Sequence, residues 1–150
     1  MSFKMDDIDK KILERLQDDA RIAFRKIAEE LEVSESTIFV RVKKLQERGV
    51  IKRFTTEISP EMVGKGLTAF ILIKADPPKY PVVLETLKKI PDIYEVYDVT
   101  GNYYTVAKVR TGDQRDLIKI IDQIGLIEGI TSTETAIVLR NVKEENRINL

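Results

Sequence analysis

The chain has 150 residues, of which 43% are hydrophobic and 33% are charged, and its 25 basic residues balance 25 acidic ones. This length can hold one ordinary domain or two small ones with packed cores. Cysteine and histidine are both absent, which removes disulfides, thiolate sites and the commonest general base and metal ligand. An enzyme or a metal centre is therefore disfavoured, and no cofactor is expected.

Targeting signals are not visible in the sequence. No apolar run approaches the length of a membrane span, and the stretch from Met1 to Ile12 has acidic residues where a signal peptide would need an apolar core. We therefore expect a soluble, cytoplasmic protein with no membrane partner.

The first third of the chain predicts two helices joined by a short turn to a third. The first helix begins near Asp6, and the second runs from about Phe24 to Leu31. Apolar residues at helical spacing form the buried stripes: Ile8, Ile12, Leu13, Leu16, Phe24, Ile27, Ala28 and Leu31. The turn consists of Glu32, Val33 and Ser34. This pattern favours a helix-turn-helix, and an ordinary three-helix bundle is the alternative.

The third helix is the centre of the prediction. Ser34 is a good N-cap, the helix runs to about Arg48, and Gly49 ends it. Ile38, Val42 and Leu45 form the buried stripe. The opposite side carries short or apolar side chains first and basic ones further along: Ser36, Phe39, Val40, Lys43 and Lys44. Such a face suits a helix whose start touches base edges while its cations meet phosphates.

Positive charge is concentrated around this helix although the whole chain is neutral. Between Ser36 and Thr56 a single acid, Glu47, accompanies six cations: Arg41, Lys43, Lys44, Arg48, Lys52 and Arg53. A charge run alone is usually a solvated face. Its coincidence with the capped helix favours DNA binding.

A connecting segment follows Gly49. Residues 50–58 predict extended chain, either a basic wing or a strand that leaves the domain, and Ser59-Pro60 and Gly64-Lys65-Gly66 interrupt it. We therefore divide the chain into a helix-turn-helix domain at residues 1–52, an extended strand and hinge at 53–66, and a second domain at 67–150.

The second domain predicts strand, helix, strand, strand, helix, strand. The strands are expected at Leu67–Ala75, Ile93–Val99, Tyr103–Arg110 and Thr131–Leu139, and the helices around Val83–Ile90 and Asp113–Ile124. Gly101-Asn102 predicts a tight hairpin turn. The fold class is α+β, with a winged-helix-like helix-turn-helix followed by a ferredoxin-like βαββαβ domain. Helices cover one face of its sheet, so we expect a second copy to cover the other.

These features together resemble the Lrp/AsnC, or feast/famine, family of transcription regulators. Four stretches carry most of the resemblance: residues 5–13, 18–21, 27–37 and 41–51. In the second half, residues 99–103, Ile124-Gly125 and Gly129 resemble the family's effector domain. The resemblance covers nearly the whole chain, and it implies a DNA-binding regulator without enzymatic activity.

The resemblance also implies the partners. A homodimer, commonly assembled into tetramers or octamers, binds partly palindromic double-stranded promoter DNA and responds to a small molecule, typically an amino acid. The DNA-binding residues implied here are Ser34, Ser36, Thr37, Phe39, Val40, Arg41, Lys43 and Lys44. Val40 stands where the family often has a polar residue, which suggests contact with a thymine methyl group. The alternative for Thr37 and Arg41 is that they brace the helix.

An effector site is implied between dimers. Its residues lie in the loop between the second and third strands and in the last helix and strand: Gly101, Asn102, Tyr103, Tyr104, Asp122, Thr133 and Thr135. Backbone amides near Gly101 suit a carboxylate, and Asp122 suits an ammonium or amide group. Relatives often carry aspartate where this chain has Asn102 and Tyr104. A plain turn and a solvated acid are the alternatives at Gly101 and Asp122. At the level of function, the alternative is an effector-independent or architectural DNA-binding protein whose second domain only oligomerises.

Overall fold

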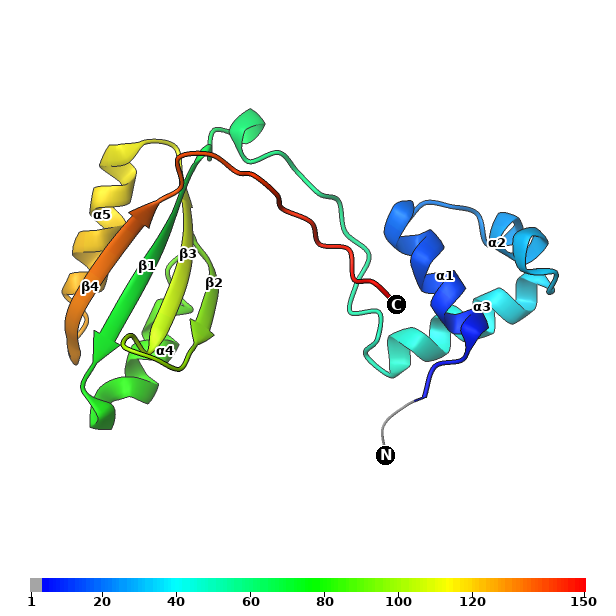
Figure 1. The fold of residues 1–150 in the computed structure, drawn as a ribbon, viewed down its shortest axis with the longest axis horizontal. Coiled ribbons are helices and arrows are strands. Elements are labelled where there is room, and N and C mark those ends of the chain that lie inside the picture. The colour runs from blue at the N-terminus through cyan, green and yellow to red at the C-terminus, as the bar shows by residue number, and fades with distance from the viewer. Residues whose placement is uncertain (1–3) are drawn as a thin grey trace. The chain divides into compact units, whose positions relative to one another are not determined.

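The computed structural model describes residues 4–150, and the chain folds into two compact units (Figure 1). The helical unit comprises the residues up to Glu57 together with Glu144–Leu150, and the sheet unit comprises Ile58–Lys143. The predicted second domain reached residue 150, whereas the structure gives its last seven residues to the helical unit. These seven residues contact parts of the helical unit that are far away in the sequence, and a local sequence pattern does not predict such contacts.

Three helices form the first unit: α1 (Asp7–Asp18), α2 (Phe24–Leu31) and α3 (Glu35–Glu47). Asp6 and Asp9 begin α1 with a capping box, in which each carboxylate accepts the other residue's backbone N–H. The buried core is formed by the predicted stripes, with Ile8, Phe24 and Leu31 packed at its edge. Its fully buried members include Ile12, Ile27, Ile38 and Leu45. The predicted helices are therefore confirmed.

The segment Glu144–Leu150 lies on the surface of α1. Gln17 Nε2 donates to the Ile148 carbonyl at 3.1 Å, and the Ile148 N–H donates back to Gln17 Oε1 at 2.7 Å. Arg147 forms an ion pair with Asp18 at 2.8 Å. A groove of about 700 Å³ that includes Leu13, Phe54 and Ile148 runs along this contact. The two ends of the described chain therefore share one unit.

The connection after α3 differs from the predicted strand. Residues 52–59 carry no regular secondary structure, and the 3-10 helix η1 (Glu61–Val63) follows them. Among the backbone hydrogen bonds of the described chain, none gives residues 53–57 a ladder partner. Without such a partner an extended segment does not become a strand.

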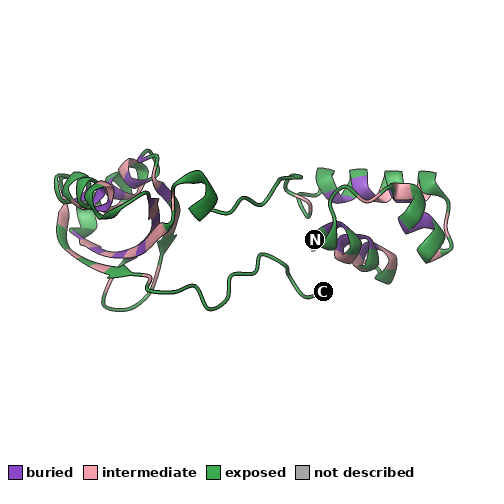
Figure 2. Ribbon diagram, turned by 90° about the horizontal axis from the view of Figure 1, so that it is seen from above, coloured by how far each residue is buried: buried purple, intermediate pink, exposed green. Residues whose placement is uncertain are grey.

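The sheet unit has the predicted order of elements. Its strands are β1 (Leu67–Ala75), β2 (Ile93–Asp98), β3 (Thr105–Thr111) and β4 (Ile130–Ile137), and its helices are η2 (Pro77–Lys79), α4 (Tyr80–Leu87) and α5 (Gln114–Gly125). The antiparallel sheet has the order β2-β3-β1-β4. Buried residues, purple in Figure 2, gather between the sheet and the two longer helices, which share one face.

The connection between β2 and β3 is wider than the predicted tight turn. The last ladder pair is Asp98 with Thr105, and the Val99 N–H donates to the Tyr104 carbonyl at 2.9 Å. Residues 100–103 therefore form the loop. The Tyr104 N–H donates to the Ile73 carbonyl of β1, so this residue is held by a different strand before β3 begins. That non-local bond explains the longer loop.

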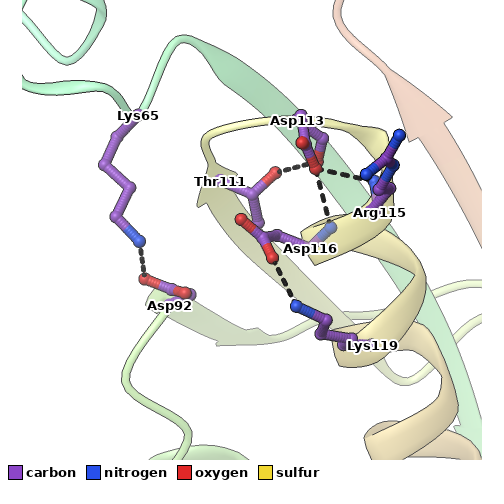
Figure 3. Close-up of polar contacts among 7 residues, drawn as sticks. All are labelled: Lys65, Asp92, Thr111, Asp113, Arg115, Asp116 and Lys119. Atoms are coloured by element: carbon purple, nitrogen blue, oxygen red, sulfur yellow. Dashed lines mark hydrogen bonds and ion pairs between the residues drawn. The ribbon is translucent and has the colours of Figure 1, made fainter.

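Polar contacts fix one end of the sheet unit (Figure 3). Asp113 caps α5 by accepting the Arg115 and Asp116 N–H groups at 2.8 and 3.0 Å. Lys65 Nζ lies 2.7 Å from Asp92 Oδ1. A Cβ atom at Gly112 would lie 3.0 Å from the Gly64 carbonyl oxygen, so the hinge residues pack closely against the loop before α5.

Candidate nucleic-acid interface and effector region

The start of α3 is held by hydroxyl groups. Ser34 Oγ accepts the Thr37 N–H at 3.1 Å, which confirms Ser34 as the N-cap. The same oxygen lies 2.7 Å from Thr37 Oγ1 and 2.9 Å from Ser36 Oγ. Three of the predicted DNA-binding side chains therefore contact one another at the helix start.

Arg41 is joined to the beginning of α1. Its Nη1 donates to Asp6 Oδ2 at 2.7 Å and to Asp9 Oδ1 at 2.8 Å. Asp9 is 7% exposed, so its charge is nearly buried. The Asp9 N–H, and then the Arg41 guanidinium, lower the pKa of Asp6, and the two carboxylates raise the pKa of Arg41. Arg41 therefore braces α3 against α1.

The outer side of α3 presents apolar surface beside cations. Phe39 and Val40 are 58% and 63% exposed. The ring of Phe39 meets that of Phe24 edge to face at 6.5 Å. Lys43 Nζ is 4.0 Å from Glu47 Oε1, a weak surface pair. A shallow hollow of about 410 Å³ lies on this side, lined by Lys4, Asp6, Asp9, Thr37, Val40, Arg41 and Lys44. All eight predicted DNA-binding residues thus lie on α3 or its cap.

The loop between β2 and β3 is anchored on the sheet face that no helix covers. Tyr103 Oη donates to Glu134 Oε2 of β4 at 2.5 Å, and this bond raises the pKa of Tyr103. Lys74 of β1 donates to Asn102 Oδ1 at 3.0 Å, and its Nζ lies 5.0 Å from the centre of the Tyr103 ring. An ammonium and a carboxylate therefore flank this aromatic ring.

Tyr80 at the start of α4 anchors the residues that flank the loop on both sides. Tyr80 Oη lies 2.8 Å from Asp98 Oδ1, 2.7 Å from the Tyr104 carbonyl and 2.8 Å from the buried Thr105 hydroxyl. The Tyr80 and Tyr104 rings meet edge to face at 5.9 Å. Desolvation is the main cause of the raised pKa of Tyr80. This hydroxyl therefore joins α4 to both strands of the hairpin.

The predicted effector residues do not form one cluster within a single chain. Tyr103 contacts Glu134, which pairs with Leu72 on the uncovered face. Thr133 and Thr135 pair with Ile73 and Ile71, so they point to the opposite face of β4. Asp122 is exposed in the last turn of α5, and Gly101 is exposed in the loop with φ +115°.

Sequence reasoning missed Lys74, Tyr80 and Glu134. The available signals were weak: Lys74 is a single charge in an apolar strand, and Glu134 lies between two candidate threonines. Strand alternation could have placed Lys74 and Glu134 on one face, but their contacts with residues 102 and 103 depend on the loop conformation.

Among residues 4–150, no three histidine, cysteine, aspartate or glutamate side chains are grouped to hold a metal ion. In the same range, no helix has both the length and the hydropathy needed to cross a membrane.

Comparisons with known proteins match both units. The winged helix-turn-helix DNA-binding family matches residues 5–52, and the Lrp/AsnC ligand binding domain matches residues 68–148. The HTH-type transcriptional regulator FL11 of Pyrococcus furiosus is 46% identical over 144 residues, covering 96% of this chain and 95% of its own. Escherichia coli AsnC is 34% identical, with a TM-score of 0.92 and coverage of 97% of this chain and 99% of its own.

A second similar structure extends the fold comparison. The transcriptional regulator NMB0573 of Neisseria meningitidis, solved in complex with L-methionine, has a TM-score of 0.91. It is 23% identical and covers 97% of both chains, so this likeness concerns the fold.

The two matched domains define a DNA-binding transcription regulator with an attached ligand-binding domain. The chain belongs to the Lrp/AsnC family.

Proposed function

We propose that this chain controls transcription as a homodimer or larger homo-oligomer that binds promoter DNA through α3, and that an amino acid held near the β2–β3 loop alters this binding. The observation that carries the proposal is the combination of an outward-facing, basic α3 with a ligand-binding domain whose sheet has one uncovered face that carries apolar side chains. Regulation by binding rather than by catalysis follows from this combination.

The DNA side of the proposal uses the surface of α3. The exposed Val40 and the nearby lysines face outward, and base edges and phosphates are the partners of such a surface. In a dimer, two copies of α3 would read half-sites about 34 Å apart, or a multiple of this distance.

The oligomeric side of the proposal uses the uncovered face of the sheet. The ladder pairs place Phe70 and Leu72 of β1 beside Val106 of β3 and Ala136 of β4 on this face. A second copy of the chain, packed sheet to sheet, would remove these side chains from water. Charged residues at the edge of this face, including Lys74 and Glu134, would then lie at the rim.

The ligand side of the proposal combines predicted and newly found residues. Amide groups near Gly101 suit an α-carboxylate, and Glu134 or Asp122 suits an α-ammonium. Because the seven candidates point in different directions within one chain, we propose that residues from more than one copy complete the site. L-Methionine is the first probe, since a protein with this fold was solved with it.

A stability screen tests the ligand. Each of the twenty amino acids is added singly during urea unfolding at constant protein concentration, and a ligand present at about 100 times its Kd raises the free energy of unfolding by about 2.7 kcal/mol. We expect one amino acid to do this in the wild type and not in Thr133→Val. Thr131→Val, an exposed change on the same strand, is the matched control. If no amino acid raises stability, the effector-independent regulator replaces this part of the proposal.

The DNA contact is tested by salt dependence. Replacing Lys43 by Ala should weaken binding to every DNA sequence and reduce the slope of log K against log salt by about one, because one phosphate contact is lost. Lys119→Ala, which removes an exposed lysine from α5, is the control. An unchanged slope in the Lys43 variant would remove this residue from the phosphate interface.

A further inference from the structure

The polar side chains at the start of α3 already bind one another or α1. Ser34, Ser36 and Thr37 share hydrogen bonds of 2.7 to 2.9 Å between their hydroxyl groups. The Arg41 Nη1 atom binds two carboxylates, one of which belongs to the nearly buried Asp9. Releasing Arg41 would leave Asp9 without its cation, which is costly for a desolvated charge. A base contact that drew Arg41 Nη1 away from these carboxylates would therefore oppose the folding of its own unit.

Val40 differs from these residues. Its side chain is 63% exposed on the same part of the helix, and it lines the hollow of about 410 Å³. Thr37 and Lys44, three residues before and four residues after it, line the same hollow, so the three side chains share one helix face. Phe39 beside it is already packed edge to face on Phe24.

The surroundings of Val40 suit the major groove of DNA. The two carboxylates in the hollow, Asp6 and Asp9, are paired with Arg41, and Lys4 and Lys44 contribute further cations that match the charge of flanking phosphates. Within the groove, thymine is the base that presents a methyl group, and apolar side chains such as alanine or the threonine methyl recognise it by contact. The branched valine side chain offers two methyl groups for the same purpose.

We propose that Val40 is the main specificity-determining residue of α3, that it recognises the 5-methyl group of thymine, and that Arg41 positions the helix instead of reading bases. This inference rests on the proposed DNA-binding function and adds the base feature that is read. In this arrangement Val40, at the centre of the exposed helix face, contacts a base, and the lysines at the edge of that face contact phosphates.

The test uses DNA in which single methyl groups are removed. A duplex is first selected by the full-length protein from a random library, and each thymine is then replaced singly by deoxyuridine, which keeps the hydrogen-bonding groups of thymine. For the wild type we expect about a fourfold loss of affinity at one position in each half-site, the effect of one buried methyl-sized group. At the other thymines we expect no change.

Two variants complete a double-mutant cycle. Val40→Ser should bind thymine and deoxyuridine duplexes equally at the sensitive positions, because serine has no methyl group to make the contact. Val82→Ser is the matched control: Val82 is 65% exposed on α4 of the sheet unit, so the same substitution should leave the deoxyuridine effect intact.

The affinities measured for the duplexes either support or overturn the inference. Sensitivity in the wild type that disappears only in Val40→Ser supports the inference. Insensitivity of the wild type at every thymine, or sensitivity that persists in Val40→Ser, overturns it while leaving DNA binding in place. Failure of the library to yield any preferred sequence overturns the proposed sequence-specific function itself.

Discussion

Arg41 shows how one residue can satisfy the sequence pattern of a DNA contact and still serve the fold. It lies on the basic side of α3, yet its guanidinium binds Asp6 and Asp9, and these two carboxylates also cap α1. The capping box and the ion pairs therefore use the same two carboxylates through different oxygens. Loss of Arg41 would disturb the start of α1 as well as the packing of α3.

Arg41→Ala should lower the free energy of unfolding of the helical unit by about 2–3 kcal/mol, because the nearly buried Asp9 loses its cation. Urea unfolding followed by far-UV circular dichroism, in which helices dominate, measures this. Arg25→Ala is the control. Its pair with Glu29 has side chains that are 78% and 65% exposed, and it should cost at most about 0.5 kcal/mol. Equal losses in both variants would contradict the bracing role of Arg41.

Acidic pH should lower the stability of the helical unit because the Asp6 carboxylate becomes protonated. The pKa of Asp6 is lowered in the folded state, so the ionised carboxylate contributes stability above its unfolded pKa, and this contribution is lost as the pH falls through the lower, folded pKa. Below about pH 5, stability should therefore decline more steeply in the wild type than in Asp6→Asn, which keeps a capping side chain. Urea midpoints measured at closely spaced pH values test this. Parallel declines would show that Asp6 is not responsible.

At the scale of elements, local patterns were sufficient wherever the determining contacts are local. The predicted bounds of α2 and β1 agree with the structure, because apolar period and turn residues act within a few positions. The partners of Arg41 lie 35 and 32 residues away in the sequence, and no periodicity reveals them. The wider β2–β3 loop likewise depends on a bond from Tyr104 to β1. For the candidate DNA-binding site, the sequence placed the residues on α3, but it did not reveal the hydrogen bonds that their side chains make.

The loop between α5 and β4 gives a test at this scale. Gly129 has φ +104°, and an added Cβ would lie 2.6 Å from Lys79 Cβ. Gly129→Ala should therefore cost about 2 kcal/mol through backbone strain and collision with η2. Gly125 is the last residue of α5, and a Cβ atom added there would meet nothing within 4 Å. Gly125→Ala should therefore raise the free energy of unfolding by about 0.5–1 kcal/mol.

Tyrosine fluorescence can report these two changes selectively. All five tyrosines lie between residues 80 and 104, so their signal follows the sheet unit during urea unfolding. Equal stability of the Gly129→Ala and Gly125→Ala variants would contradict the close approach of the loop to η2.

At the scale of the whole molecule, the proposed assembly would bury the uncovered face of the sheet. Leu72→Glu places a charge among Phe70, Val106 and Ala136, so burial against a second copy becomes unfavourable. We expect multi-angle light scattering to show monomers, and DNA affinity to fall by at least about tenfold as two-site binding is lost.

A matched change on the helical side separates assembly from folding. Ile118 is 49% exposed on α5, and Ile118→Glu should leave both mass and affinity unchanged. Tyrosine fluorescence should report a folded sheet unit in both variants. A Leu72→Glu protein that keeps the wild-type mass would place the oligomer interface elsewhere.

The segment Glu144–Leu150 makes the sheet unit topologically an insertion within the helical unit. A chimera that joins this helix-turn-helix to another regulator's effector domain at a single junction after Glu57 would therefore discard the pairing of Gln17 with Ile148 and of Arg147 with Asp18. Successful exchange of effector domains should need two junctions, at 57/58 and 143/144. Recombination between regulators of this architecture is then constrained at both ends of the exchanged piece.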